Sequence, residues 1–179
     1  MSMTDNEFDK NIGLIRQGNQ EGLKAIYEAY LPAVYSSVLA VLHNEQSAQD
    51  VTADFFIRLW EIAGQYRQGG KHKAWMMTVA HNMAVDHLRK YRHEELVEQV
   101  SDLPESRTAA ISEEDRVCSE LTLKQALETL EEEERQIVNL KIMGELTLKE
   151  ISQIMKKPLG TVAWKYRVAL NKLKRCRYE

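Results

Sequence analysis

One long segment without a helix breaker limits the fold more than any other feature of the sequence. Gly69-Gly70 cannot sit cheaply inside a helix, whereas no Gly or Pro occurs from Lys73 through His93. Mostly apolar residues recur there at helical spacing and define one face: Met76, Ala80, Met83, Ala84, His87, Leu88 and Tyr91. A polar stripe follows another face: Asn82, Asp86, Arg89 and His93. The spacing therefore predicts an unbroken amphipathic helix.

Basic residues stand at both ends of this segment. Lys71 and Lys73 precede the expected helix, and Arg89, Lys90 and Arg92 close it. Cations at a helix C-terminus interact favourably with the helix dipole, which is one explanation. The other is single-stranded nucleic acid, because aromatic rings stack on bases, cations hold phosphates and Asn reads base edges. The periodicity leaves both interpretations open.

The first sixty residues also carry helical periodicity. We expect residues 1–9 to be frayed, helices from Ile12 and from Gln20 to Leu42, and a break at Gly18-Asn19. Pro32 either kinks the second helix or begins a new one. A third helix is predicted from about Ser47 to Ala63, with Ser47 as its N-cap.

The predicted third helix has two distinct faces. Its apolar stripe is rich in aromatic side chains: Val51, Phe55, Phe56, Leu59, Trp60 and Ile62. Asp50, Asp54 and Glu61 line another face. This is either a core stripe with a solvated acidic back, or an acidic and aromatic docking face for a basic partner helix.

Charge is segregated along the chain, although the net charge is only −3. Acidic residues dominate 94–119, which also contains Pro104, whereas 156–178 has eight Lys and Arg and no acid. The acidic segment is typical of a flexible, self-repelling linker. We therefore expect an all-α protein of two small helical domains, 10–93 and 120–179, joined by the linker 94–119.

The C-terminal segment has the pattern of a helix-turn-helix. Apolar positions predict helices over about 121–130 and 135–143, and Gly144 is a helix-end signal. Thr147-Leu148-Lys149-Glu150 reads as a capping box for a short helix that ends before Pro158. A long basic helix follows from about 160 to 175, where a DNA-reading helix would stand. A plain helical hairpin is the rival, but it does not require the uniformly basic C-terminus.

Other classes of site are disfavoured by composition. The two cysteines, Cys118 and Cys176, lack metal-site spacing, and no two histidines lie at i, i+4, so we expect no metal site and exposed or half-buried histidines. No signal core and no apolar run of the ~18 residues that a membrane span needs is evident. We expect a cytoplasmic protein without membrane insertion.

Three motifs, in this order, resemble the extracytoplasmic-function (ECF) sigma factors of the sigma-70 superfamily. Residues 50–60 resemble region 2.2, an acid-x-x-x-acid-x-Phe-x-x-x-Trp pattern. Residues 73–89 resemble regions 2.3 and 2.4 through Ala74-Trp75, Ala80-x-Asn82, Asp86 and Leu88-Arg89. Glu150-Ile151 and Gly160-Thr161-Val162 resemble the region 4.2 helix-turn-helix. The resemblance covers roughly 20–93 and 120–175.

The resemblance implies three binding surfaces and no catalytic residues, metal or cofactor. The first would dock on the clamp helices of the largest subunit of core RNA polymerase: Asp50, Asp54, Phe55, Arg58 and Trp60. The second would bind and melt the −10 promoter element, with an extruded base held around residues 71–82: Lys71, Lys73, Trp75, His81, Asn82, Asp86, Arg89 and Lys90. The third would read the −35 element: Thr161, Ala163, Trp164, Lys165, Arg167 and Lys172. The resemblance further implies contact with the polymerase flap, a linker in the RNA-exit path and an anti-sigma partner.

Departures from the family pattern concern the DNA-reading residues. The family often has Gln at Ala53, Arg at His81, a basic residue and Ser at Ala163-Trp164, and Arg at Val168. Bidentate base readout is therefore reduced, and Trp164 would contact thymine methyl groups instead. The main rival function is a helix-turn-helix regulator that acts without polymerase docking, such as a response regulator. The N-terminal half argues against this class because it lacks the alternating strands and helices of a receiver domain. An all-helical adaptor would leave the basic C-terminus unexplained.

Overall fold

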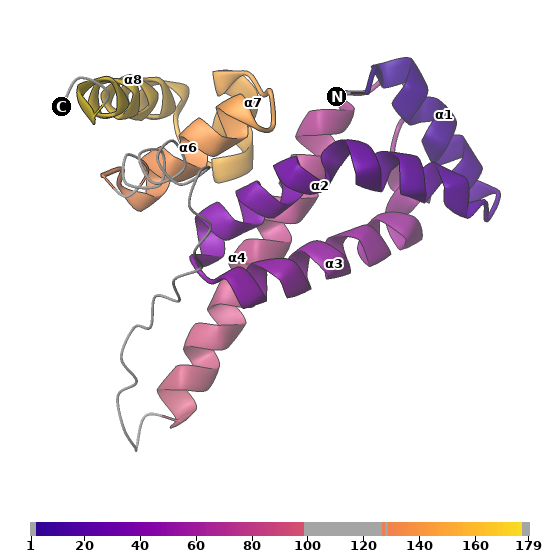
Figure 1. The fold of residues 1–179 in the computed structure, drawn as a ribbon, viewed down its shortest axis with the longest axis horizontal. Helices are drawn as coiled ribbons and strands as arrows, with labels where there is room; N and C mark the ends of the chain where they lie inside the picture. Colours follow the sequence, from indigo (N-terminus) through magenta and orange to yellow (C-terminus); the bar gives the residue numbers. More distant parts are fainter. Residues whose placement is uncertain (1–2, 99–126, 128, 177–179) are drawn as a thin grey trace, which may run out of the picture.

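The computed structural model describes residues 3–98, 127 and 129–176, and all regular structure in those residues is helical (Figure 1). The elements are α1 (Asp5–Arg16), α2 (Gln20–Leu42), α3 (Glu45–Ile62), the short 3-10 helix η1 (Ala63–Gln65), α4 (His72–Glu98), α6 (Glu132–Ile142), α7 (Leu148–Met155) and α8 (Leu159–Cys176). We call α1–α4 the N-terminal unit and α6–α8 the C-terminal unit. The all-α prediction is confirmed.

Helix α1 begins at Asp5, within the residues that the sequence pattern left frayed. The Thr4 hydroxyl accepts a hydrogen bond from the amide of Glu7, and the amide of Thr4 donates one to the Glu7 carboxylate at 2.8 Å. The ring of Phe8 is fully buried and packs against three other rings. The prediction for residues 5–9 was wrong because one capping box and one aromatic anchor hold a short polar helix.

Helix α2 is the central helix and passes through Pro32 without ending. It packs against α1, α3, α4 and α6. By length and composition it could cross a membrane, contrary to the expectation that no run is long enough, but half of its most apolar window is buried inside the protein. Its contacts make it a core helix.

Helix α3 begins one turn earlier than expected. The Asn44 side chain accepts a hydrogen bond from the amide of Ser47 at 2.8 Å and is the N-cap. Ser47 is therefore the third residue of the helix, and its prediction as the cap was wrong. Both residue types cap helices well, so composition alone does not choose between them.

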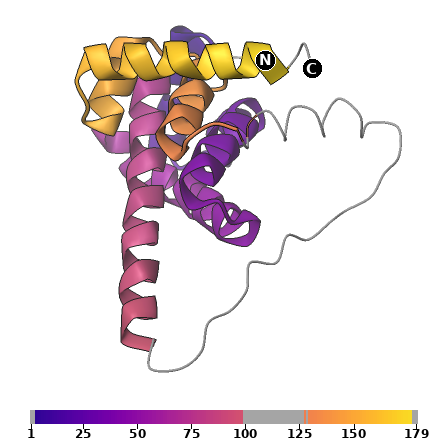
Figure 2. The same cartoon turned by 90° about the vertical axis from the view of Figure 1, so that its left-hand side faces the viewer.

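The two units share one hydrophobic core. Met76 and Met77 of α4 belong to the same buried cluster as Ile137 and Leu140 of α6 and Ile151 of α7. Helix α4 continues through Glu98, and its C-terminal part projects away from the other helices (Figure 2). The predicted domain bounds stay a prediction, and residues 99–119 of the linker and most of the helix expected at 121–130 lie outside the described residues.

The C-terminal unit has the predicted helix-turn-helix order. Thr147 and Glu150 form the expected capping box of α7, and Lys156 ends that helix in the left-handed conformation with φ 54°. Helix α8 follows Pro158 and buries Val162 and Ala169 against the unit. A tight turn and two inward side chains thus fix how α8 is presented to solvent.

Candidate nucleic-acid and protein interfaces

The predicted docking face on α3 is accessible, with one exception. Asp50, Asp54 and Arg58 are exposed, and Arg58 donates to Glu61 at 3.0 Å. Trp60 is half-buried against the core. Phe55 is fully buried, so it supports the core of the N-terminal unit and does not reach a partner. Its assignment to the docking face is corrected because the stripe at i, i+4 faces inward.

An apolar groove of about 320 Å³ lies beside this face, between α2 and α3. Tyr27 is 43% exposed and its ring lies 4.8 Å from that of Phe56. Leu23 and Trp60 complete the apolar lining, and Lys24 stands at the edge. The sequence pattern missed Tyr27 because it appeared as one more core position of α2. Groove and acidic face together fit a protein partner with apolar and basic side chains.

Two of the four Lys and Arg residues predicted to bind the −10 element face acidic side chains of the C-terminal unit. Lys71 Nζ lies 2.7 Å from Glu150 Oε1, and Lys73 pairs with Glu145. The Glu150 carboxylate also accepts from the amide of Thr147 in the capping box of α7. No local signal in the sequence connects residues about 75 positions apart, so these pairs could not be predicted.

The other residues of the −10 set divide between surface and interior. Asn82, Asp86, Arg89 and Lys90 are exposed on α4. Trp75 is half-buried, with its ring 5.0 Å from that of Tyr66. His81 and His72 are buried, which corrects the expectation of exposed or half-buried histidines for both. Burial, followed by the charge of Lys156, lowers the pKa of His81.

The contact between the two units also has polar members. Ser37 Oγ donates to Asn139 Oδ1 at 3.1 Å. Arg135 Nη1 lies 2.9 Å from His43 Nδ1. Burial lowers the pKa of His43, the Arg135 charge lowers it further, and Glu132 opposes this. Burial and the nearby cations of the C-terminal unit therefore both favour the neutral forms of His43 and His81.

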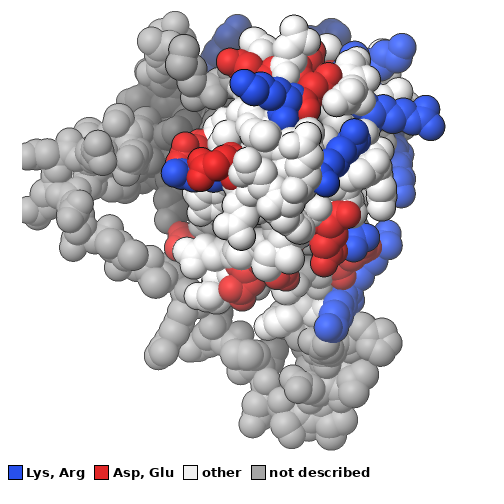
Figure 3. All heavy atoms as spheres, turned by 90° about the vertical axis from the view of Figure 1, so that its right-hand side faces the viewer, with Lys and Arg blue, Asp and Glu red and all other residues white. Residues whose placement is uncertain are grey.

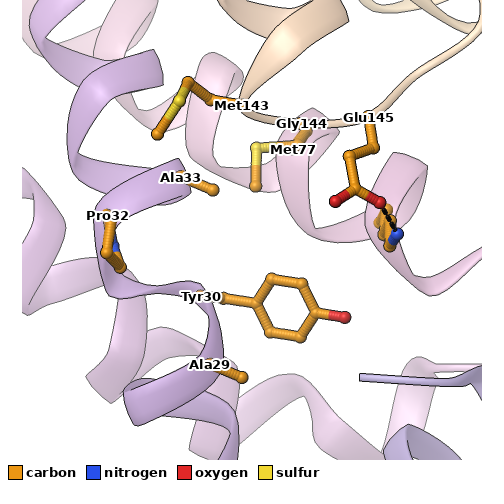
Figure 4. A pocket seen from close by; sticks show the side chains of 9 residues that line it. Ala29, Tyr30, Pro32, Ala33, Met77, Met143, Gly144 and Glu145 are labelled. Atoms are coloured by element: carbon orange, nitrogen blue, oxygen red, sulfur yellow. Dashed lines mark hydrogen bonds and ion pairs between the residues drawn. The ribbon is translucent and has the colours of Figure 1, made fainter. Parts of the chain in front are cut away.

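A small cavity of about 170 Å³ lies where the units meet (Figure 4). Tyr30, Pro32 and Met77 line it from the N-terminal unit, and Met143 and Glu145 line it from the other. The Lys73–Glu145 ion pair stands at its edge (Figure 4). Packing between the units is thus incomplete here, which is consistent with a contact that can separate.

The predicted −35 set is split between solvent and ion pairs. Trp164 is 59% exposed and Arg167 is exposed, whereas Thr161 and Ala163 are half-buried. Lys165 is only 18% exposed and lies 3.1 Å from Glu133, which raises the pKa of Lys165. Lys172 donates to the buried carboxylate of Glu134 at 2.8 Å.

Lys165 and Lys172 therefore tie α8 to α6 in this arrangement. Trp164 and Arg167 are the large side chains of the set that point to solvent. One face of the molecule shows acidic and basic side chains together, and many of the basic ones lie along its right-hand edge (Figure 3). In the part of the chain that the structure describes, no three His, Cys, Asp or Glu residues gather as metal ligands.

Comparison with known families gives two matches, one in each unit. Sigma-70 region 2 matches residues 26–94, and Sigma-70, region 4 matches residues 126–175. The chain is 28% identical over 163 residues to the ECF RNA polymerase sigma factor SigW of Bacillus subtilis (strain 168), covering 86% of this chain and 87% of that one. It is 25% identical over 181 residues to the ECF RNA polymerase sigma factor SigK of Mycolicibacterium vanbaalenii, covering 95% and 89%.

Two solved structures have the same fold. The first is the sigma factor RpoE in complex with the anti-sigma factor NepR from Bartonella quintana, with TM-score 0.68, 21% identity, and coverage of 87% of this chain and 96% of that one. The second is CnrH in complex with the cytosolic domain of CnrY, with TM-score 0.60, 17% identity, and coverage of 94% and 96%.

Proposed function

This chain belongs to the sigma-70 family, and from that premise we propose that it is an ECF sigma factor that directs core RNA polymerase to its promoters. It binds core polymerase, recognises the −10 and −35 elements and initiates transcription without a catalytic step of its own. Its place of action is the bacterial cytoplasm. The observation that carries the proposal is the presence, in one chain, of an exposed acidic face on α3 beside an apolar groove and of an outward-facing helix-turn-helix.

The α3 face is the surface for the clamp helices of the largest subunit. Asp50 and Asp54 lie one turn apart and both are exposed, so they can pair with cations of a partner helix. The groove lined by Tyr27, Phe56 and Trp60 lies alongside and offers apolar area. A regulator that binds DNA alone has no use for this combination.

The DNA surfaces lie on α4 and α8. Asn82, Arg89 and Lys90 offer amide and cationic groups to a melted −10 strand. On α8, exposed Trp164 and Arg167 occupy the major-groove side of the helix-turn-helix. The C-terminal unit would also contact the polymerase flap.

Both promoter elements cannot be bound while the units are in contact. Positions −10 and −35 lie about 25 base pairs apart, which is roughly 85 Å at about 3.4 Å per base pair. In the structure, Lys71 of the −10 set lies 2.7 Å from Glu150 of the helix-turn-helix. The units must therefore separate. A segment as long as 99–119 has a maximal reach of roughly 70 Å, which with the width of both units covers the distance.

An anti-sigma factor is part of the proposal. The chain resembles in fold the sigma factor RpoE, which was solved with such a partner. A partner that keeps the units together would leave Lys71 and Lys73 paired with acidic residues. Purification of the chain from cells in which its target genes are silent should recover this partner, and recovery of the chain alone would count against it.

Run-off transcription is the test of the proposed function. Core polymerase of the host, this chain and a duplex library randomised at the −10 and −35 elements should give transcripts from a defined subset of templates. Asp54→Arg should abolish association with core polymerase and leave helicity unchanged. Lys10→Glu reverses an exposed charge on α1 and is the matched control. Tight binding to duplex DNA without core polymerase, and no transcript with it, would favour a regulator.

A further inference from the structure

Helix α1 lies before the region matched to the family and holds the segment that leads into α4. We call residues 66–71 the 66–71 loop. Arg16 Nε donates to the carbonyl of Ala63 at 3.1 Å, and Arg16 Nη2 donates to the carbonyl of Tyr66 at 2.5 Å. The guanidinium thus binds one backbone carbonyl at the start of η1 and one at the start of the loop.

Asp9 of the same helix holds the middle of the loop. The amide of Gly69 donates to Asp9 Oδ2 at 2.9 Å, and Gly69 has the left-handed φ of 72°. Tyr66 turns back and donates to the carbonyl of Gly70 at 3.1 Å. Burial, and then the charge of Asp9, raises the pKa of Tyr66 to about 12, so its hydroxyl stays protonated and remains a donor.

The far end of the loop is fixed as well. His72, the first residue of α4, is buried and is hydrogen-bonded to Asp5 of α1 and, at 2.5 Å, to the hydroxyl of Tyr30. Its ring stacks on that of Phe8 at 4.6 Å between centroids. Charged or aromatic side chains of α1 therefore contact the beginning, the middle and the end of one short loop.

The 66–71 loop lacks regular hydrogen bonding of its own apart from one turn. Its internal backbone bond runs from the amide of Gly70 to the carbonyl of Arg67 at 3.2 Å. Arg67 and Gln68 are exposed at its tip, next to Lys71. Because hydrogen bonds to ionised groups are stronger than those between neutral groups, Asp9 and Arg16 decide which conformation the loop adopts.

We propose that α1 is a brace for base recognition, and that Asp9 and Arg16 are positioning residues for the −10 element. They hold the 66–71 loop in the conformation that places Lys71 and the start of α4 where the base extruded from the −10 strand is received. Extrusion breaks stacking, and a loop that had to be ordered at the same moment would weaken binding further. This inference rests on the proposed function, because it presumes that the chain captures a −10 base.

The test measures base discrimination by the holoenzyme. The probes are single strands carrying the −10 element of a promoter selected in run-off transcription, each with one abasic position. For the wild-type protein, loss of one particular base should weaken binding tenfold or more, as expected when a stacked base is removed. In Arg16→Met this penalty should fall below threefold, while affinity for core polymerase stays the same.

Two variants separate bracing from general effects. Lys10→Met removes an exposed cation from the same helix without a contact to the loop, and it should keep the full penalty. Arg16→Lys keeps the positive charge and one donor group. This variant should recover most of the binding penalty for the missing base. Hydrogen exchange of the full-length chain should be faster at 66–71 in Arg16→Met than in Lys10→Met, with α2 and α3 unchanged.

The outcomes are distinguishable. If the wild-type holoenzyme selects no promoter, the proposed function fails and the brace fails with it. If the wild-type protein discriminates and Arg16→Met discriminates equally, or exchange at 66–71 does not change, the brace alone is refuted. If Arg16→Met loses its helical circular dichroism, Asp9→Asn is used in its place. Asp9→Asn removes the charge of the side chain but keeps an acceptor oxygen, and the same two measurements decide the outcome.

Discussion

Removal of the Glu145 charge should loosen the contact between the two units by a small and calculable amount. Glu145→Gln keeps the size of the side chain and removes its attraction to Lys73. The two side chains are 53% and 26% exposed, so the pair falls in the range of about 0.2–1 kcal/mol measured for exposed pairs. The separated population should therefore rise between about 1.4-fold and fivefold.

The same magnitudes indicate that this variant does not open the protein completely. Ile137 and Leu140 belong to the core shared by the units, and burial of such side chains contributes about 1.5–3 kcal/mol each. The apolar contact therefore outweighs the ion pair. A fully separated Glu145→Gln protein would contradict this reasoning as clearly as an unchanged one.

A buried thiol at the contact reports the separated population. Ser37 is 4% exposed and bonded to Asn139, so Ser37→Cys places a thiol there once Cys118 and Cys176 are replaced by Ser. Its alkylation rate should rise by the same 1.4-fold to fivefold in Glu145→Gln at low salt.

Salt and a matched variant provide the controls. The difference should become smaller near 0.5 M salt, because screening weakens a partly exposed ion pair. Glu61→Gln breaks a more exposed ion pair on α3, away from the contact, and should not change the rate. The reasoning is refuted if both variants accelerate alkylation equally or if the effect is as large at high salt as at low salt.

Three further predictions follow from single side chains. Burial and neighbouring cations lower the pKa values of His43 and His81, so the folded contact favours their neutral forms. Stability should therefore be full above about pH 6.5 and decrease as the pH falls below it. Because only the thiolate reacts, the alkylation rate of the reporter thiol is divided by that of a free thiol at the same pH. This ratio should be higher at pH 5.5 than at pH 7.5, unless both histidines are replaced by Gln. Phe8→Ala should lower the free energy of unfolding by about 3–5 kcal/mol in urea titrations, because the ring is fully buried. Trp164→Ala should weaken transcription from templates that depend on the −35 element and leave the affinity for core polymerase unchanged, since the side chain is exposed.

The sequence was most informative where structure depends on neighbours along the chain. The helix from 73 onwards, the capping box at Thr147 and the turn before α8 all depend on residues within a few positions of each other. Helix caps were less certain, as Asn44 and Ser47 show, because several polar residues compete near one helix start. The prediction of a frayed N-terminus was wrong for a different reason. Phe8 is an isolated apolar residue in a polar segment, and its burial depends on rings from three distant positions.

Composition predicted which segments carry the binding surfaces, but it did not predict which of their side chains are accessible. The stripe on α3 indicated a docking face, but its period could not distinguish Phe55, which is buried, from Trp60, which is half-buried and lines the groove. Likewise the cations of α8 indicated DNA binding, although Lys165 and Lys172 are paired with acids of α6. Such partners lie more than thirty positions away, and only folding shows which cations remain available.

The nature of the contact between the units indicates which ligand must bind first. Promoter DNA binds mainly through its phosphates, so it can compete for Lys71 and Lys73 against Glu150 and Glu145. It offers nothing to replace the apolar core that the units share. Core polymerase presents protein surfaces, which can cover apolar area on both units as they separate. Promoter affinity should therefore rise far more on addition of core polymerase than on lowering the salt. If low salt alone gave the free chain its full promoter affinity, the contact between the units would be electrostatic, and the apolar core would not be what holds them together.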